Sequence, residues 1–376
     1  MKIIHLANTD FEFELAHTDD LSIEQSWARH PLCLQLQFVP LLYAKPGEII
    51  AVTRLPDHAF IRDFQKMSWR RQEEFPSLAL LEEEEPFCEA RCQSWGPSLK
   101  VLKWTQQRRM DYTIPPWEIV YQINSKAFSF QYTKLKQAVL VYQEKDLFNW
   151  LKEVPGPKVL KTCFGLSGKG NRLIREQTSI DSLLAFCKKE WALGRPLVAE
   201  PWVERCLDFS TQWIVHPDGR QELLGTTVFE TDSHGGYQAT LAGPQEILFH
   251  SYKPFLNEHI RAVEKMLKDL SQMGFFGHVG VDALLYWHEK DREICLYPIV
   301  EINGRQTMSL AALRLQQRWF PDRVIRFSFA QADDPRPSLL PLSMESKNYP
   351  PLFFKRKLVV EENPSYEVVG KKPPKL

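Results

Sequence analysis

The chain has 376 residues, 44% of them hydrophobic and 25% charged, which is the composition of an ordinary globular protein. This length exceeds what one hydrophobic core usually organises, so it predicts two or three domains. Lysine plus arginine equals aspartate plus glutamate at 47 each, so the net charge gives no reason to expect a nucleic acid partner. No apolar run approaches the roughly 20 residues that span a bilayer, and the N-terminus lacks a secretion signal, so no membrane partner is expected.

The seven cysteines are odd in number and scattered along the chain. Cys88 and Cys92 have no second pair that would complete a zinc site. Reduced thiols in a cytoplasmic protein are therefore the simplest interpretation.

The first part of the chain has the pattern of a small α/β unit. Apolar runs at 2–7 and 48–53 predict two short strands, with a helix-like segment and a turn at 45–47 between them. The acidic run 82–85 predicts a solvated surface segment, and the segment 113–117 predicts a loop. Because the pattern changes at residue 118, we expect an N-terminal domain over 1–117.

Residues suited to phosphate follow this boundary. Asn124 or Ser125 is a plausible helix cap, which places Lys126 in the first helical turn, where backbone N–H groups also favour phosphate. A short strand at 158–161 leads into the loop 162–171, whose glycines allow the bare backbone to approach a polyphosphate. The spacing does not match a P-loop, and a plain hairpin turn and a surface lysine remain the alternatives.

The extended segment 196–203 contains an acid between apolar neighbours. Glu200 and the backbone groups beside it can meet the edge of a purine, while apolar side chains sandwich the ring. Asp208, before the apolar run 209–215, can hold a ribose hydroxyl. The alternative interpretation is an edge strand broken by Pro201.

Residues 223–241 predict two strands around a turn. The segment 254–273 is the clearest helix, because its apolar residues recur at spacings of three and four and Gly274 follows it. After these come two apolar strands, Val279–Trp287 and Ile294–Ile302, around the charged turn 288–293.

This hairpin brings polar oxygen atoms together. Alternation along a strand puts Glu301 and Asn303 on one face, and the start of the first strand, which carries Asp282, lies near the end of the second. Two carboxylates and an amide oxygen form the kind of site that Mg²⁺ takes. Solvated acids at the ends of a hairpin are the alternative.

Beyond this hairpin the pattern predicts a helix at 310–315 and the end of the ordered region at 321–330. The remaining residues, 331–376, are proline-rich and contain a predicted strand at 352–360.

Taken in order, these signals resemble the ATP-grasp family: a lysine, a lysine before a Gly/Ser loop, Glu-Pro-Trp-Val, an aspartate, and Glu-x-Asn. The resemblance covers about 120–315, and 1–117 is similar to the small α/β domain that usually precedes the family's fold. It implies an α+β protein in which two subdomains grip ATP, with an ATP-grasp domain over 118–330 and a C-terminal extension over 331–376.

The resemblance also implies roles for single residues. Those implied to hold or cover the phosphates are Lys126, Lys161, Ser167, Gly168, Lys169 and Gly170. Those implied to bind the nucleoside are Glu200, Trp202 and Val203 at adenine and Asp208 at ribose. The implied ligands of Mg²⁺, or of Mn²⁺, are Asp282, Glu301 and Asn303. Catalytic roles fall on Lys161 and Arg305, the latter near the reacting carboxylate. The hinge at 204–207 lacks the glycine common in the family, so Glu204 and Asp208 both remain candidates for the ribose.

The implied activity is that of an ATP-dependent carboxylate–amine ligase that releases ADP and phosphate. Its substrates would be a small-molecule carboxylate and an amine, with an amino acid or peptide as the acceptor. A small-molecule kinase of the same fold and a non-catalytic ATP-binding regulatory module are the alternatives. Such folds often form homodimers.

Overall fold

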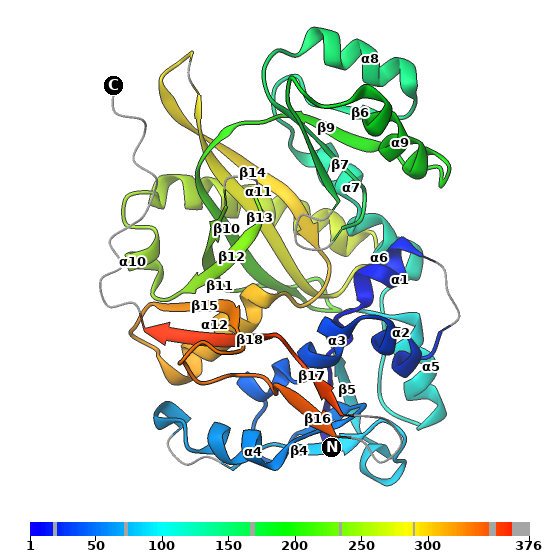
Figure 1. Ribbon diagram of the computed structural model, residues 1–376, viewed down its shortest axis with the longest axis vertical. Helices are drawn as coiled ribbons and strands as arrows, with labels where there is room; N and C mark the ends of the chain where they lie inside the picture. The colour runs from blue at the N-terminus through cyan, green and yellow to red at the C-terminus, as the bar shows by residue number, and fades with distance from the viewer. Residues whose placement is uncertain are drawn as a thin grey trace. The chain divides into compact units, whose positions relative to one another are not determined.

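The computed structural model describes residues 1–17, 21–70, 74–165, 170–232, 235–288, 290–345 and 351–362 (Figure 1). These residues form two compact units, each built from separate stretches of the chain. One unit contains 1–117, 238–248 and 305–362, and the other contains 118–237 and 249–304, with the gaps given above. The domain limits predicted from the sequence remain a prediction. None of the helices in the described ranges has the length and apolar character that a membrane span needs.

The first unit contains a four-stranded parallel sheet with the order β4-β2-β1-β5. Its strands are β1 (Ile3–Leu6), β2 (Ile49–Val52), β4 (Ser77–Leu80) and β5 (Arg91–Ser94). Parallel neighbours need crossover connections. Between β1 and β2 lie the helices α1 (Phe11–Ala16), α2 (Ile23–Arg29) and α3 (Pro31–Leu36) and a 3-10 turn at Val39–Leu42. Between β2 and β4 lie α4 (His58–Gln65) and a 3-10 turn at Ser68–Arg70, and between β4 and β5 a 3-10 turn at Glu85–Phe87; α5 (Leu99–Gln107) follows β5. The predicted strands at 2–7 and 48–53 are confirmed as β1 and β2.

The later stretches of this unit add α10 (Gln245–Leu248), α12 (Met308–Trp319) and several strands. These are β12 (Tyr237–Ala242), β15 (Ile325–Gln331), β16 (Ser343–Glu345), β17 (Leu352–Phe353) and β18 (Arg356–Glu362). β15 lies between β12 and β18, and β16 pairs with β17 and with the short β3 (Leu55–Pro56).

Ordered structure therefore continues past residue 330, where the sequence had predicted its end. The predicted strand at 352–360 is two strands, because the chain leaves the extended pairing at Phe354 and Lys355. Leu340, Met344 and Leu358 are fully buried and pack in one cluster with Phe38. Apolar burial thus holds these late strands in the core of the unit.

The second unit contains a small antiparallel sheet with the order β6-β9-β7-β8. Its strands are β6 (Val139–Val141), β7 (Lys158–Lys161), β8 (Asn171–Ile174) and β9 (Leu197–Pro201). Helices α8 (Glu144–Glu153) and α9 (Ile180–Trp191) pack on one face through Leu147, Leu183 and their neighbours. Side chains alternate along β7, so its other face carries Val159 and Lys161.

The same unit contains long antiparallel strands in the order β14-β13-β10-β11. They are β10 (Glu204–Val215), β11 (Gln221–Thr231), β13 (Gly277–His288) and β14 (Glu293–Asn303). Helix α11 (Lys253–Gln272) covers one face of them with Val263, Leu267 and Leu270, as its apolar spacing predicts. The shorter α6 (Trp117–Ile123) and α7 (Lys126–Tyr132) precede the sheets in the chain. The opposite face of these strands is where the polar residues of interest lie.

Candidate functional site

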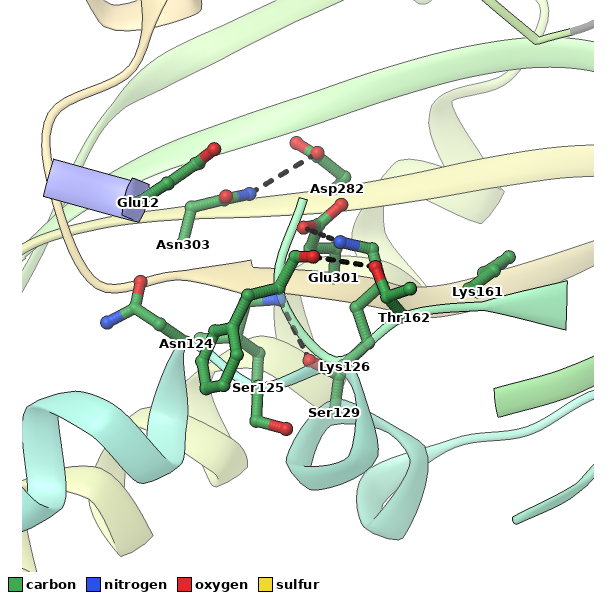
Figure 2. Close-up of polar contacts among 12 residues, drawn as sticks. Glu12, Asn124, Ser125, Lys126, Ser129, Lys161, Thr162, Asp282, Glu301 and Asn303 are labelled. Carbon is green, nitrogen blue, oxygen red and sulfur yellow. Dashed lines mark hydrogen bonds and ion pairs between the residues drawn. The ribbon is translucent and has the colours of Figure 1, made fainter. Parts of the chain in front are cut away.

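A row of polar side chains crosses neighbouring strands of the second unit. Asp282 on β13 lies directly opposite Glu301 on β14, and on its other side opposite Ser210 on β10. One step along, Gly280 lies opposite Asn303. Directly opposed residues share a face of an antiparallel sheet. The prediction that Asp282, Glu301 and Asn303 meet at one end of the hairpin is therefore confirmed (Figure 2).

The carboxylates of Asp282 and Glu301 repel each other. Burial and the neighbouring Glu301 carboxylate raise the pKa of Asp282 to about 7, against the lowering influence of Ser210, Lys126 and Asn303. The Asn303 amide donates from Nδ2 to Asp282 Oδ2 at 3.3 Å. Lys126 donates to Glu301, with 2.7 Å between Nζ and Oε1. A single lysine thus balances a pair of like-charged groups.

This donor set fits a hard divalent cation. A cation between two repelling carboxylates relieves the repulsion that raises the pKa of Asp282, and carboxylate and amide oxygens are the ligands that Mg²⁺ prefers. Within the described ranges, no group of three or more His, Cys, Asp and Glu side chains could hold a metal ion. Asp282 and Glu301 would therefore need the Asn303 amide oxygen and water or phosphate as further ligands.

Lys126 is the first residue of α7, as predicted, and Ser125 rather than Asn124 caps that helix. Ser125 Oγ accepts the N–H of Ala127, while the Asn124 side chain bonds to Val120 and to the Gly304 backbone. The backbone N–H of Lys126 donates to Cys163, beside the end of β7. The start of α7 is therefore fixed to both sheets of the unit (Figure 2).

Lys161, at the end of β7, is buried in a second charged cluster. Its Nζ lies 2.5 Å from Glu200 Oε2 on the adjacent β9, and Tyr297 of β14 donates to Glu200 Oε1 at 2.8 Å. All three residues are less than a tenth exposed. Burial and the Glu200 carboxylate keep the pKa of Tyr297 far above its usual range, so the phenol remains a hydrogen-bond donor. Glu200 therefore fixes Lys161 and joins the two sheets.

The glycine-bearing loop begins where β7 and β8 diverge. Thr162 N donates to Gly170 O at 2.9 Å, which extends the pairing of Lys161 with Asn171 by one step. A side chain on Gly170 would lie 2.2 Å from Thr162 Oγ1, so only glycine fits at this position. Ser167, Gly168 and Lys169 lie outside the described residues.

The predicted hinge residues belong to a strand, since β10 begins at Glu204. Asp208 is paired with Arg205 at 3.1 Å and accepts from Thr231, whereas Glu204 is exposed. Trp202 N donates to Pro157 O, and the Trp202 ring stacks with the Arg205 guanidinium. Val203 packs near Leu284 and Tyr297. Glu204 and Asp208 both stay candidates for a ribose contact.

A cavity of about 510 Å³ lies beside these elements. Val159 and Leu173 of the open face of the small sheet line it, together with Asn171, Trp202 and Gly236. The rest of its lining is polar: Arg172, Gln177, Thr178, Ser179 and Ser182.

Arg305 belongs to the first unit, where it forms an ion pair with Glu12 after β1. It also donates to the Gln306 carbonyl at 3.0 Å. Burial lowers the pKa of Arg305 to about 10, which still leaves the guanidinium charged at neutral pH.

Sequence reasoning missed three polar residues of these clusters: Glu12, Ser210 and Tyr297. A signal existed for Tyr297, because it precedes Glu301 by an even number of residues in the same strand. For Glu12 and Ser210 nothing local pointed to their partners, which are distant in the chain.

The elements define a recognised class of fold: two sheets of one unit, joined by the bond between Tyr297 and Glu200 and preceded in the chain by a parallel α/β sheet. This is the ATP-grasp fold, as the sequence predicted. No protein-family model matches the sequence, and no curated protein matches it.

Solved structures do match. A phosphoribosylamine–glycine ligase from Thermotoga maritima has a TM-score of 0.55 at 13% identity, over 98% of this chain and 94% of that one. A biotin carboxylase from Campylobacter jejuni has a TM-score of 0.51 at 12% identity, over 73% of this chain and 71% of that one. An N5-carboxyaminoimidazole ribonucleotide synthetase in an ADP complex has a TM-score of 0.50 at 12% identity, over 96% of this chain and 92% of that one. At such identities the likeness shows the fold.

Proposed function

We propose that the protein is an ATP- and Mg²⁺-dependent ligase that joins a small carboxylate to an amine and releases ADP and phosphate. The observation that carries this proposal is the Asp282–Glu301 pair, held in register on two strands with Lys126 on Glu301. Such a site serves to position and neutralise phosphate groups, which is most of what phosphoryl transfer requires. The similar structures support the ligase class, since one is named for joining phosphoribosylamine to glycine and two others are ATP or ADP complexes.

The proposed reaction has two steps. A carboxylate oxygen of the first substrate attacks the γ-phosphorus of ATP, the bond to the β-phosphate oxygen breaks, and ADP leaves. The amine nitrogen then attacks the acyl carbon, phosphate leaves with the bonding electron pair, and the nitrogen loses a proton. Mg²⁺ would supply charge neutralisation for the phosphates at Asp282, Glu301 and Asn303.

The chain's own residues would have separate tasks in this scheme. Lys126 would exchange its Glu301 partner for phosphate oxygen, and Lys161, positioned by Glu200, would hold a second phosphate. Gly170 and the neighbouring Ser167, Gly168 and Lys169 would cover the phosphates. Trp202 and Val203 would border the base, and Arg305 would stabilise negative charge at the reacting carboxylate.

The first test is release of ADP and free phosphate from MgATP in the presence of pooled amino acids and small carboxylates. We expect release that depends on a pool and on divalent metal. Glu301→Gln should lower it at least about a hundredfold, because a removed metal carboxylate weakens positioning and charge neutralisation together. Glu293→Gln, an exposed glutamate at the start of the same strand, is the matched control and should retain normal rates.

Three other outcomes would contradict the ligase. ADP without matching free phosphate would instead identify a kinase. Tight ATP binding with no release in any pool would identify a regulatory module. Equal release by wild type and Glu301→Gln would remove the proposed site from the reaction.

A further inference from the structure

β14, which carries Glu301 and Asn303, is an edge strand and is irregular. Asp282 faces Glu301 and Leu284 faces Tyr297, so two steps along β13 correspond to four along β14. The two extra residues lie in the segment Pro298–Val300, which we call the β14 bulge. Extra residues in one strand of a pair change the direction of the side chains next to them.

The bulge changes the direction of the side chains between Tyr297 and Glu301. Ile299, two residues before Glu301, would share the face of Glu301 in a regular strand. It instead packs with Val263 and Leu267 of α11 on the opposite face. Tyr297 and Glu301 both point away from α11, the first to Glu200 and the second to Lys126, and the bulge turns Ile299 between them toward that helix.

Helix α7 takes the place of a neighbouring strand along this edge. Thr133, at the end of α7, donates from Oγ1 to the Ile299 carbonyl at 2.7 Å and accepts the Ile299 N–H at 3.2 Å. Ser129 Oγ accepts the N–H of Ile302 at 3.0 Å. Lys126, Ser129 and Thr133 are spaced by three and four residues, so one side of the helix reaches the strand. Figure 2 shows Lys126 and Ser129 beside Glu301.

A buried histidine of α11 also holds the bulge, from the sheet face that this helix covers. His259 of α11 donates from Nδ1 to the Pro298 carbonyl at 2.6 Å, since that oxygen can only accept. Its Nε2 accepts from Thr211 Oγ1 at 2.8 Å, and Thr211 in turn accepts from Trp213 Nε1. His259 is fully buried, and its tautomer is fixed by these partners. Both carbonyl groups at the centre of the bulge are thus bonded to side chains, that of Pro298 to His259 of α11 and that of Ile299 to Thr133 at the end of α7.

We propose that Thr133 is a positioning residue for the metal-binding carboxylate Glu301. It acts by fixing the β14 bulge, which His259 also holds, without contact to metal or substrate. This inference rests on the proposed function, because it assigns Glu301 to a divalent cation. Groups that orient metal ligands from a distance commonly change metal affinity by 10- to 100-fold when they are removed.

The test is binding of Mn²⁺ in the presence of ATP, followed by electron paramagnetic resonance of free Mn²⁺, for wild type and Thr133→Val. Valine keeps the shape of threonine and removes both bonds to Ile299. We expect Mn²⁺ affinity to fall about tenfold. The maximal rate at saturating metal should stay within about twofold, because the ligands themselves are intact. Thr133→Ser should restore affinity, since serine keeps the hydroxyl.

The matched control is Thr105→Val in α5: Thr105 is a buried threonine whose hydroxyl, like that of the partly buried Thr133, donates to a backbone carbonyl. Its Mn²⁺ affinity should equal that of wild type. If Thr133→Val cannot be purified folded, Ser129→Ala, which removes only the acceptor for Ile302, takes its place with the same expectation.

The outcomes separate the two proposals. Wild-type protein that binds no Mn²⁺ with ATP would overturn the proposed function and, with it, this inference. Normal Mn²⁺ affinity in Thr133→Val and Ser129→Ala, or an equal loss in Thr105→Val, would overturn the positioning role alone.

Discussion

At the scale of single residues, the charged side chains of the second unit occur as small compensated clusters. Glu200 is buried, and its two oxygens are bonded to Lys161 and Tyr297. A buried carboxylate needs such partners, because an unpaired one would cost several kcal/mol of folding free energy. The same bonds hold the Lys161 charge at the end of β7, where the proposed function assigns it to phosphate.

Replacing Tyr297 with phenylalanine tests this cluster. The change removes the hydroxyl and leaves a Glu200 oxygen without its donor, so we expect a loss of about 1–3 kcal/mol in the free energy of unfolding. Urea unfolding measures it. Tyr142→Phe is the control, since Tyr142 is 60% exposed, and its effect should stay within about 0.5 kcal/mol. Equal midpoints for the two variants would show that the Tyr297 hydroxyl contributes nothing.

At the scale of elements, α11 both covers a sheet face and inserts His259 into it. Burial lowers the pKa of His259 from 6.5 to about 4. In the unfolded chain His259 binds a proton near pH 6.5, whereas in the folded protein it does so only near pH 4. Acid therefore favours unfolding. This stability is fully present above about pH 6.5 and is lost as the pH falls toward 4, by up to about 3 kcal/mol.

The pH dependence can be assigned to this side chain by comparison with His259→Gln. We expect the urea midpoint of the wild type to fall between pH 7 and pH 4 more steeply than that of the variant, which has no imidazole to protonate. The variant should also be less stable at pH 7, because the bonds to Pro298 and Thr211 are altered. Parallel pH dependences in the two proteins would assign the acid sensitivity to other groups.

The elements also show what a local pattern can predict. The β13–β14 hairpin and α11 follow from alternation and from helical spacing, and the meeting of Asp282, Glu301 and Asn303 was predicted because a hairpin fixes which ends meet. The bulge was missed although Pro298 marked it, since proline inside a strand is typical of an edge or a bulge. Partners such as Glu200 and Tyr297 are 97 residues apart, and no local pattern links them.

At the scale of the whole molecule, the prediction of an ordered region that ends at 330 was wrong because the pattern after it is weak. Among prolines and short strands, the local pattern does not show that residues such as Leu340 and Leu358 are buried. Their burial depends on partners from distant stretches of the chain. Two strands of the parallel sheet, β1 and β2, were easier to predict because they are short apolar runs, whereas β4 and β5 were not predicted.

Leu358→Ala measures how much the late strands contribute to the first unit. Leu358 has no exposed surface, and truncating a buried leucine leaves a cavity, so we expect a loss of about 2–5 kcal/mol. Phe353→Ala on the neighbouring β17 is the control, since Phe353 is 78% exposed. Urea unfolding should separate the two variants clearly. A Leu358→Ala protein as stable as Phe353→Ala would mean that β18 is not part of the cooperative core.

The discontinuous first unit affects how the chain emerges from the ribosome. The buried Gln35 side chain donates to the carbonyls of Pro341 and Arg356, the second of them 321 residues further along. At the usual rates of synthesis, about 15 to 60 s separate the two ends of that bond. During this interval the cluster around Phe38, which needs Leu340 and Leu358, stays incomplete, whereas the cluster around Trp27 takes its buried residues from 4–110 and the second unit is complete once residue 304 has emerged. We therefore expect the apolar surface around Phe38 to stay exposed on the nascent chain until the late strands have been made.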